Sequence, residues 1–153
     1  MTSPTLYETD FNLWIEQTVQ QLQRGQLQEL DVENLIEEVA SMGRSDKREV
    51  YSRLRVLLLH LLKWQYQPSK QTGSWIATID EQRSQLQLIL RDSPSLKPYL
   101  QDQLADCYQS ACQGAAKETH LAIATFPLEC PFTEAQMLDI DYLPDSPSGE
   151  SLG

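Results

Sequence analysis

Residues 56–64 read VLLLHLLKW and form the most apolar stretch of the chain. Seven of these nine side chains are apolar. On a helix of 3.6 residues per turn they cover almost the whole circumference. A helix that is apolar on all sides is normally buried among other helices. We therefore expect a central helix with the remaining helices packed around it.

An amphipathic helix is predicted over residues 5–24. Thr9 or Asp10 can cap its start, and Gly25 is placed to end it. The apolar positions recur at helical spacing and define one stripe: Phe11, Trp14, Ile15, Thr18 and Leu22. This stripe is expected to face the core.

A second helix is predicted to begin after the N-cap residue Asp31 and to close at Gly43. Its predicted core face consists of four apolar residues: Val32, Leu35, Ile36 and Val39. The central helix then follows from about Ser45 to Tyr66, and Pro68 stops it. Gly43 thus separates two predicted helices.

Two longer helices and a short one are expected in the rest of the chain. The fourth helix runs from the cap Ser74 to Arg91, the fifth covers about 98–125, and a short helix is possible at 134–140. No segment shows the alternating pattern of a strand, and no internal repeat is visible. The predicted class is all-α, an antiparallel bundle of about five helices around the central hydrophobic helix.

The length of 153 residues fits one domain, which we place at residues 1–143. The formal net charge is −10, and residues 129–153 contain six acids and no Lys or Arg. Residues 144–153 are expected to form a flexible acidic tail. The N-terminus has no hydrophobic signal segment, so a cytoplasmic protein without membrane contact is expected. Three cysteines, an odd number, argue against a closed disulfide framework.

Five of the twelve basic residues lie in one window: Arg44, Lys47, Arg48, Arg53 and Arg55. Such a window is usually a solvated helix face, although it leaves room for a local anionic partner. The acidic net charge disfavours nonspecific binding of nucleic acid. We therefore expect no nucleic-acid partner.

Four ionisable residues interrupt apolar faces on four predicted helices. Arg83 lies within the stripe of the fourth helix, and Glu118 lies within that of the fifth. His60 sits at the shoulder of the central stripe, and Glu38 borders the face of the second helix. These positions predict that all four side chains point toward one core.

Buried charges need partners, because an isolated one costs several kcal/mol. Glu118 is the expected partner of Arg83, with Glu38 second, and His60 could donate to the remaining carboxylate. Either the cluster is a structural network that fixes the helix register, or it is a polar pocket that binds or transforms a ligand.

Metal binding is not expected from this sequence. The chain lacks Glu-x-x-His, His-x-x-x-His and Cys-x-x-Cys patterns, and an adjacent Arg83 would repel a cation. His120 is expected to be exposed on the opposite face of its helix. We predict no metal and no other cofactor.

Four stretches carry a resemblance to a known family: YETDFNLW at 7–14 and the segments 30–68, 74–100 and 115–138. The blocks HLLKWQYQP at 60–68 and FPLECPFT at 126–133 are its most specific parts. The chain resembles, over about residues 6–143, the bacterial family numbered twenty-nine among domains of unknown function, which is common in cyanobacteria. The resemblance implies a compact all-α domain. It implies no activity and no catalytic residue.

The sequence favours a binding or protein-interaction module that contacts a protein partner or a second copy. The alternative is a small enzyme or ligand-binding protein that uses Glu38, His60, Arg83 and Glu118. An open cleft beside these residues would favour the alternative, and a sealed network would favour the module.

Overall fold

The computed structural model describes residues 5–147, and within this range every regular element is helical. The elements in chain order are α1 (Leu6–Thr9), α2 (Phe11–Gln23), η1 (Leu27–Glu29), α3 (Val32–Tyr66), η2 (Pro68–Lys70), α4 (Gly73–Asp92), α5 (Leu96–Thr119), η3 (Ile123–Thr125) and α6 (Glu134–Leu138). The predicted all-α class is confirmed.

Backbone contacts divide the chain into two compact units, residues 1–45 and residues 46–153. We call them the first unit and the second unit and describe each by itself. The proposal of one domain over residues 1–143 stays a prediction.

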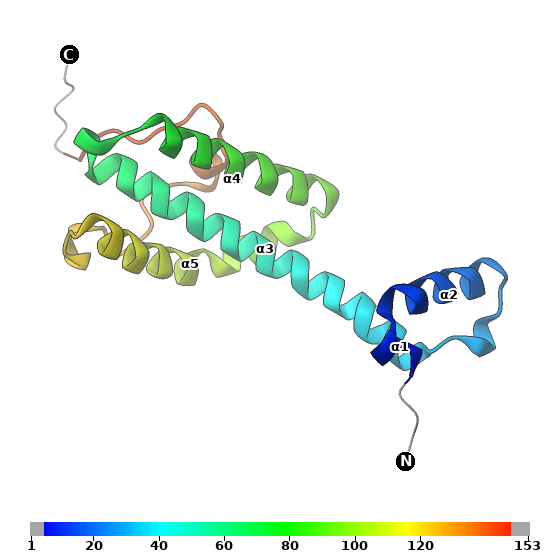
Figure 1. The fold of residues 1–153 in the computed structure, drawn as a ribbon. Helices are drawn as coiled ribbons and strands as arrows, with labels where there is room; N and C mark the ends of the chain where they lie inside the picture. Colours follow the sequence, from blue (N-terminus) through cyan, green and yellow to red (C-terminus); the bar gives the residue numbers. More distant parts are fainter. Residues whose placement is uncertain (1–4, 148–153) are drawn as a thin grey trace. The chain divides into compact units, whose positions relative to one another are not determined.

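The first unit contains α1, α2, η1 and the start of α3 (Figure 1). The single helix predicted over residues 5–24 is wrong, because Asp10 leaves the helical conformation at φ −150° and ends α1. Its carboxylate then accepts a hydrogen bond from the Leu13 amide, which caps α2. Gly25, at φ +69°, follows the end of α2 as expected.

Helix α3 is continuous from Val32 to Tyr66, so the predicted break at Gly43 is wrong. Asp31 caps the helix as expected, since its Oδ1 accepts from the amide of Asn34. Gly43 keeps a negative φ inside the helix. A glycine ends a helix when it adopts the left-handed conformation, and without that turn it merely weakens the helix by about 1 kcal/mol.

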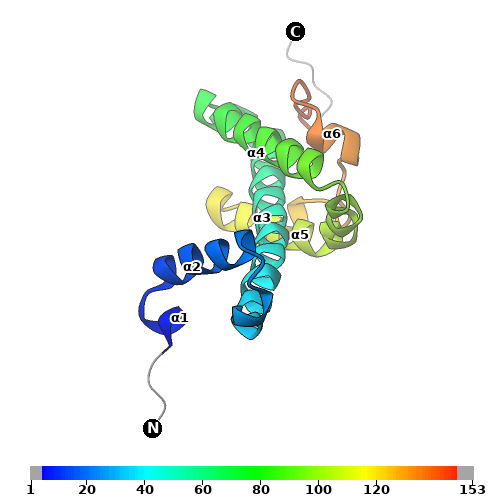
Figure 2. The same cartoon turned by 90° about the vertical axis from the view of Figure 1, so that its right-hand side faces the viewer.

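The second unit is built around residues 46–66 of α3, which lie between α4 and α5 (Figures 1 and 2). Leu54, Leu57, Leu58, Leu61 and Leu62 are completely buried there. The predicted central hydrophobic helix is confirmed. A Cβ atom at Gly114 of α5 would lie 2.7 Å from Leu59 Cδ1, so the glycine permits close approach of α5 to α3.

Some predicted helix boundaries in the second unit differ from those of the structure. The N-cap of α4 is Thr72 rather than Ser74, because the Thr72 hydroxyl accepts from the Trp75 amide. Helix α5 ends at Thr119 rather than near residue 125, because His120 adopts the left-handed conformation at φ 61°. Of the predicted tail, Pro144 is buried, and residues 148–153 lie outside the described residues.

Candidate functional site

Glu38 belongs to the first unit, whereas the other three residues of the predicted polar cluster belong to the second. It is half-buried and accepts a hydrogen bond from the hydroxyl of Tyr7. This hydrogen bond raises the pKa of Tyr7. Glu38 therefore links α1 to α3 within the first unit.

Arg83 is fully buried on α4, as its position in the stripe predicts. The predicted pairing with Glu118 is wrong. Arg83 Nε donates to the carbonyl oxygen of Met137 at 2.8 Å, and Nη2 donates to that of Gln136 at 3.1 Å. These carbonyls end α6, where backbone acceptors are unpaired and a cation is favoured. Arg83 thus fastens α6 to α4, and Gln87 adds a bond to the carbonyl of Leu138.

Glu118 is half-exposed rather than buried, and its carboxylate lies 3.8 Å from Lys63 Nζ. The predicted stripe through Glu118 assumed a helix that reaches Ala122. The buried face of α5 runs instead through Tyr108, Ala111, Ala115 and Thr119, and at 100° per residue Glu118 lies at its edge.

His60 is half-buried on α3, and its Nδ1 lies 2.9 Å from the carbonyl oxygen of Val56. Burial lowers the pKa of His60, and Lys63 lowers it further, while the backbone contact and Glu118 oppose them. The structure brings His60 and Glu118 toward Lys63 and places neither beside Arg83. Within the second unit, His60, Arg83 and Glu118 therefore do not form one network.

The basic window is partly used in packing and pairing. Arg53 pairs with Glu49 at 2.8 Å, Arg55 Nε donates to Ser110, and Lys47 Nζ lies 5.6 Å from the ring centroid of Tyr99. These contacts support the interpretation of this window as an ordinary helix face.

The feature of the first unit that most resembles a site is an exposed apolar surface. On α2, Trp14 and Thr18 are buried, whereas the adjoining stripe is 39–46% exposed. At 100° per residue, these four exposed residues lie within a contiguous arc. They are Phe11, Ile15, Val19 and Leu22.

The predicted core face of the second helix is also exposed. Leu35 is half-buried, but the rest of that stripe is 51–63% exposed. On the polar side of these turns of α3, Glu38 contacts Tyr7 of α1. The exposed residues are Val32, Ile36, Val39 and Met42. We refer to these four and the four of α2 together as the apolar surface.

The predicted stripes face the core only in part. Trp14 and Thr18 are buried as expected, whereas the prediction is wrong for the other members of the α2 stripe and for Val32, Ile36 and Val39. Periodicity shows that a face is apolar, but burial needs a second element to cover it. Among residues 5–45 the buried residues are Trp14 and Thr18, so neither stripe buries the other.

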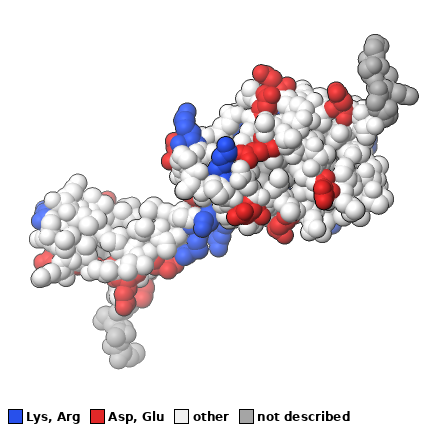
Figure 3. All heavy atoms as spheres, turned by 180° about the vertical axis from the view of Figure 1, so that it is seen from behind, with Lys and Arg blue, Asp and Glu red and all other residues white. Residues whose placement is uncertain are grey.

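Charge surrounds the apolar surface but does not enter it. Residues 5–45 contain eight acids and two bases, a net charge of −6. The only charged residue of α2 is Glu16, which lies about 100° from Ile15 around the helix. Figure 3 shows a visible face of the first unit that is mostly uncharged, with acidic side chains gathered at an edge. The surface is suited to an apolar partner.

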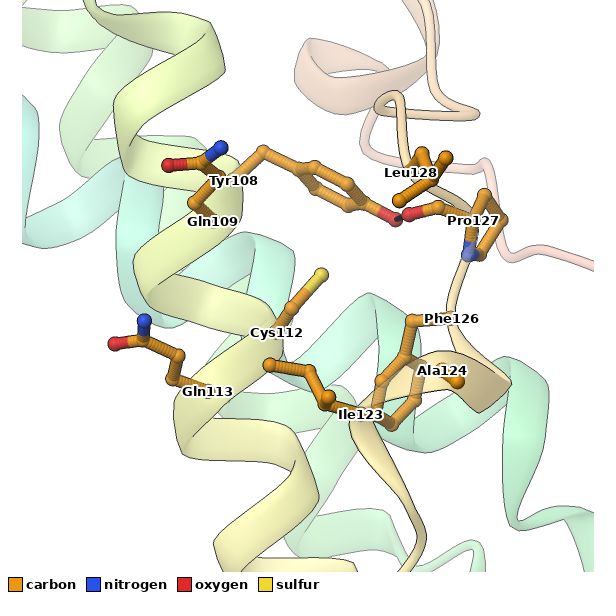
Figure 4. A pocket seen from close by; sticks show the side chains of 9 residues that line it. All are labelled: Tyr108, Gln109, Cys112, Gln113, Ile123, Ala124, Phe126, Pro127 and Leu128. Carbon is orange, nitrogen blue, oxygen red and sulfur yellow. Dashed lines mark hydrogen bonds between the residues drawn. The ribbon is translucent and has the colours of Figure 1, made fainter.

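A cavity of about 660 Å³ lies in the second unit between α5 and the segment around η3 (Figure 4). Its lining contains no charged side chain: Tyr108, Gln109, Cys112, Gln113, Ile123, Ala124, Phe126, Pro127 and Leu128. The Tyr108 hydroxyl is committed to the carbonyl oxygen of Pro127 at 2.7 Å. Burial raises the pKa of both Tyr108 and Cys112, so both stay neutral near pH 7. The cavity can accept uncharged, apolar groups.

A smaller cavity of about 200 Å³ lies in the first unit beside Trp14, Glu29 and Asp31. Its volume is below the usual range for a ligand pocket. Neither cavity is lined by Glu38, His60, Arg83 or Glu118.

Sequence reasoning found the stripes of the first unit but assigned them to the core, and it missed the cavity of the second unit. The signal for the cavity was available in the block FPLECPFT, where apolar residues follow a helix and prolines prevent another. Such a segment has no helical periodicity, so the sequence does not show which of its apolar side chains are buried.

Residues 5–147 contain neither a candidate metal site nor a candidate membrane-spanning helix. In that range no group of three or more His, Cys, Asp or Glu side chains is placed to hold a metal ion. No helix in the described part of the chain is long and apolar enough to span a bilayer.

Comparison with known proteins adds a family but no activity. We found no match to this chain among curated proteins or among solved structures. The model of the family described as "Domain of unknown function DUF29" matches residues 6–143, nearly the whole chain. The chain therefore belongs to this family of domains of unknown function.

Proposed function

We propose that the protein is an interaction module whose first unit binds another polypeptide through the apolar surface. The observation that carries this proposal is the exposure of eight large apolar side chains on two neighbouring helices. Monomeric proteins rarely expose contiguous apolar patches larger than a few hundred Å², and larger patches mark interaction sites. The second unit contrasts with the first, because its helices bury their stripes against each other.

The chemistry of the surface indicates a helical polypeptide as the partner. Each stripe follows helical spacing, and an apolar helix placed alongside it would present its own side chains at matching intervals. No polar group interrupts either set of four residues. The partner is therefore held by burial of apolar area rather than by ion pairs.

The proposal is tested by site-specific photocrosslinking in cells that naturally produce the protein. A photoreactive phenylalanine analogue is placed at Ile36 or at Ile15, with Gln20 as the control, because Gln20 is exposed on α2 outside the stripe. We expect a discrete crosslinked band from positions 36 and 15 and none from position 20. Equal yields from all three positions, or no band at all, would refute the proposal.

A second candidate function rests on the cavity beside Tyr108 and Ile123. Its volume of about 660 Å³ lies within the usual range for ligand sites. Its uncharged lining suits a small apolar ligand. Cys112→Trp would fill the cavity, so it should abolish nuclear magnetic resonance shifts that an uncharged aromatic probe causes in the wild type. Unchanged shifts in the variant would exclude this site.

We propose no reaction for Glu38, His60, Arg83 and Glu118. Arg83 is occupied by backbone carbonyls and Glu38 by Tyr7. These contacts support structural roles for the two residues.

A further inference from the structure

The two stripes of the apolar surface are similar in size. The α2 stripe extends from residue 11 to residue 22, and the α3 stripe extends from residue 32 to residue 42. At 1.5 Å per residue, each is roughly 15–17 Å long. Both contain four large aliphatic or aromatic side chains, and both remain uncovered. Each stripe is thus a suitable cover for the other.

Within one chain the two stripes do not bury each other. Trp14 and Thr18 are the buried residues of α2, and all four members of each stripe stay exposed. The rings of Tyr7 and Trp14, whose centroids are 4.9 Å apart, pack against each other and against one side of the Phe11 ring. A stripe on α2 can therefore be covered by α3 only if that α3 belongs to another molecule.

We propose that a second copy of this chain covers the apolar surface, with α2 of each copy packed on residues 32–42 of the other. This inference rests on the proposed function and names its partner. The arrangement is isologous, so it closes after two copies and leaves no unpaired stripe.

The available area supports a stable dimer. The eight side chains are each roughly half exposed and together offer on the order of 800 Å² per copy, the size of a standard interface. Homodimer interfaces are also more apolar than other interfaces, which agrees with the absence of charge from both stripes.

Charge gives the dimer a recognisable salt dependence. The first unit carries a net charge of −6, so two copies repel each other. Added salt screens that repulsion, and we expect the dimer to become tighter between low and physiological ionic strength. A basic partner would show the opposite dependence.

The experiment measures the mass of the purified full chain by sedimentation equilibrium at a concentration on the order of 100 µM. We expect about 35 kDa, twice the chain mass of 17.5 kDa. Ile15→Glu and Ile36→Lys should each give the single-chain mass, because each places a charge in both copies of the interface. Gln20→Glu, the matched control on the exposed polar side of α2, should remain dimeric.

Mixing the two monomeric variants tests which helices pair. In a mixed dimer, one interface pairs the introduced carboxylate at position 15 of one copy with the introduced ammonium group at position 36 of the other copy. The second interface contains the wild-type residues at both positions. We expect the mixture to recover the dimer mass while each variant alone does not. A mixture that stays monomeric would overturn the pairing of α2 with α3.

The result that overturns the second copy as partner is a single-chain mass for the wild type at this concentration. That result leaves the interaction role to be judged by photocrosslinking. A crosslinked band at position 36 with a mass other than that of two chains would then show that a different polypeptide covers the surface. No band there would remove the proposed function as well.

Discussion

The two units of this chain carry apolar helical stripes of comparable regularity, but they bury them to different extents. In the second unit α3 lies between α4 and α5, and Leu54, Leu57 and Leu61 are inaccessible to solvent. In the first unit the buried side chains are Trp14 and Thr18. The comparison teaches that a sequence pattern records which face is to be covered but not which molecule covers it.

The largest expected difference between the units appears on truncation of one apolar residue in each. Leu57→Ala should lower the free energy of unfolding by about 2–5 kcal/mol, because it leaves a cavity in a closed core. Val39→Ala should change it by less than about 0.5 kcal/mol at dilutions where the chain is monomeric. Urea denaturation measures both values. Equal losses would show that the stripe of α3 is covered within one chain.

Arg83→Met should cost about 1–3 kcal/mol, because the carbonyls of Gln136 and Met137 lose their buried donor. Glu118→Leu should stay within about 0.5 kcal/mol, since Glu118 is half-exposed. The two losses should add, with a coupling energy below about 0.5 kcal/mol. A larger coupling in the double-mutant cycle would restore the pairing that the sequence suggested.

Two glycines of the first unit give smaller effects of opposite sign. Gly43→Ala should stabilise the protein by about 0.5–1 kcal/mol, because Gly43 is helical and its added Cβ meets no atom within 4 Å. Gly25→Ala should destabilise it by about 1 kcal/mol, because φ is +69° there. Thermal unfolding at fixed concentration measures both changes. Loss of stability in Gly43→Ala would argue that the continuous α3 is incorrect.

The smallest expected effect is the pH dependence due to His60. Burial lowers its pKa, so the folded state binds this proton less tightly than the unfolded state does. The stabilising contribution is therefore complete above the ordinary pKa near 6.5 and is lost as pH falls toward the lower folded value. His60→Gln should flatten the decline in unfolding free energy between pH 7 and pH 5. An unchanged slope would show that His60 titrates as it does in the unfolded chain.

Much of the second unit could be predicted from sequence, because its helices have broad apolar stripes and the helices that cover one another are close in the chain. The central helix followed directly from VLLLHLLKW. Arg83 was correctly placed in a buried stripe, but its partners were not predictable, because backbone carbonyls carry no sequence signal. Glu118 was misplaced because the predicted stripe ran through it to Ala122, whereas the buried face of α5 leads to Thr119.

The first unit was predicted less well, and for physical reasons. Gly43 is the residue type that often ends a helix, but it does not adopt the left-handed conformation that ends one. Asp10 breaks what looked like one helix while capping the next. The stripes of α2 and α3 were identified correctly as apolar, but their partner was assumed to lie within the same chain.

The most direct test of this account is amide hydrogen exchange of the full chain at two protein concentrations. At high concentration we expect protection of α2 and of residues 32–42, and that protection should fall on dilution as the dimer dissociates. Residues 54–62 of α3 should remain protected at both concentrations, because the second unit covers them itself. Protection of α2 and residues 32–42 that does not change with concentration would contradict the claim that another copy completes the first unit.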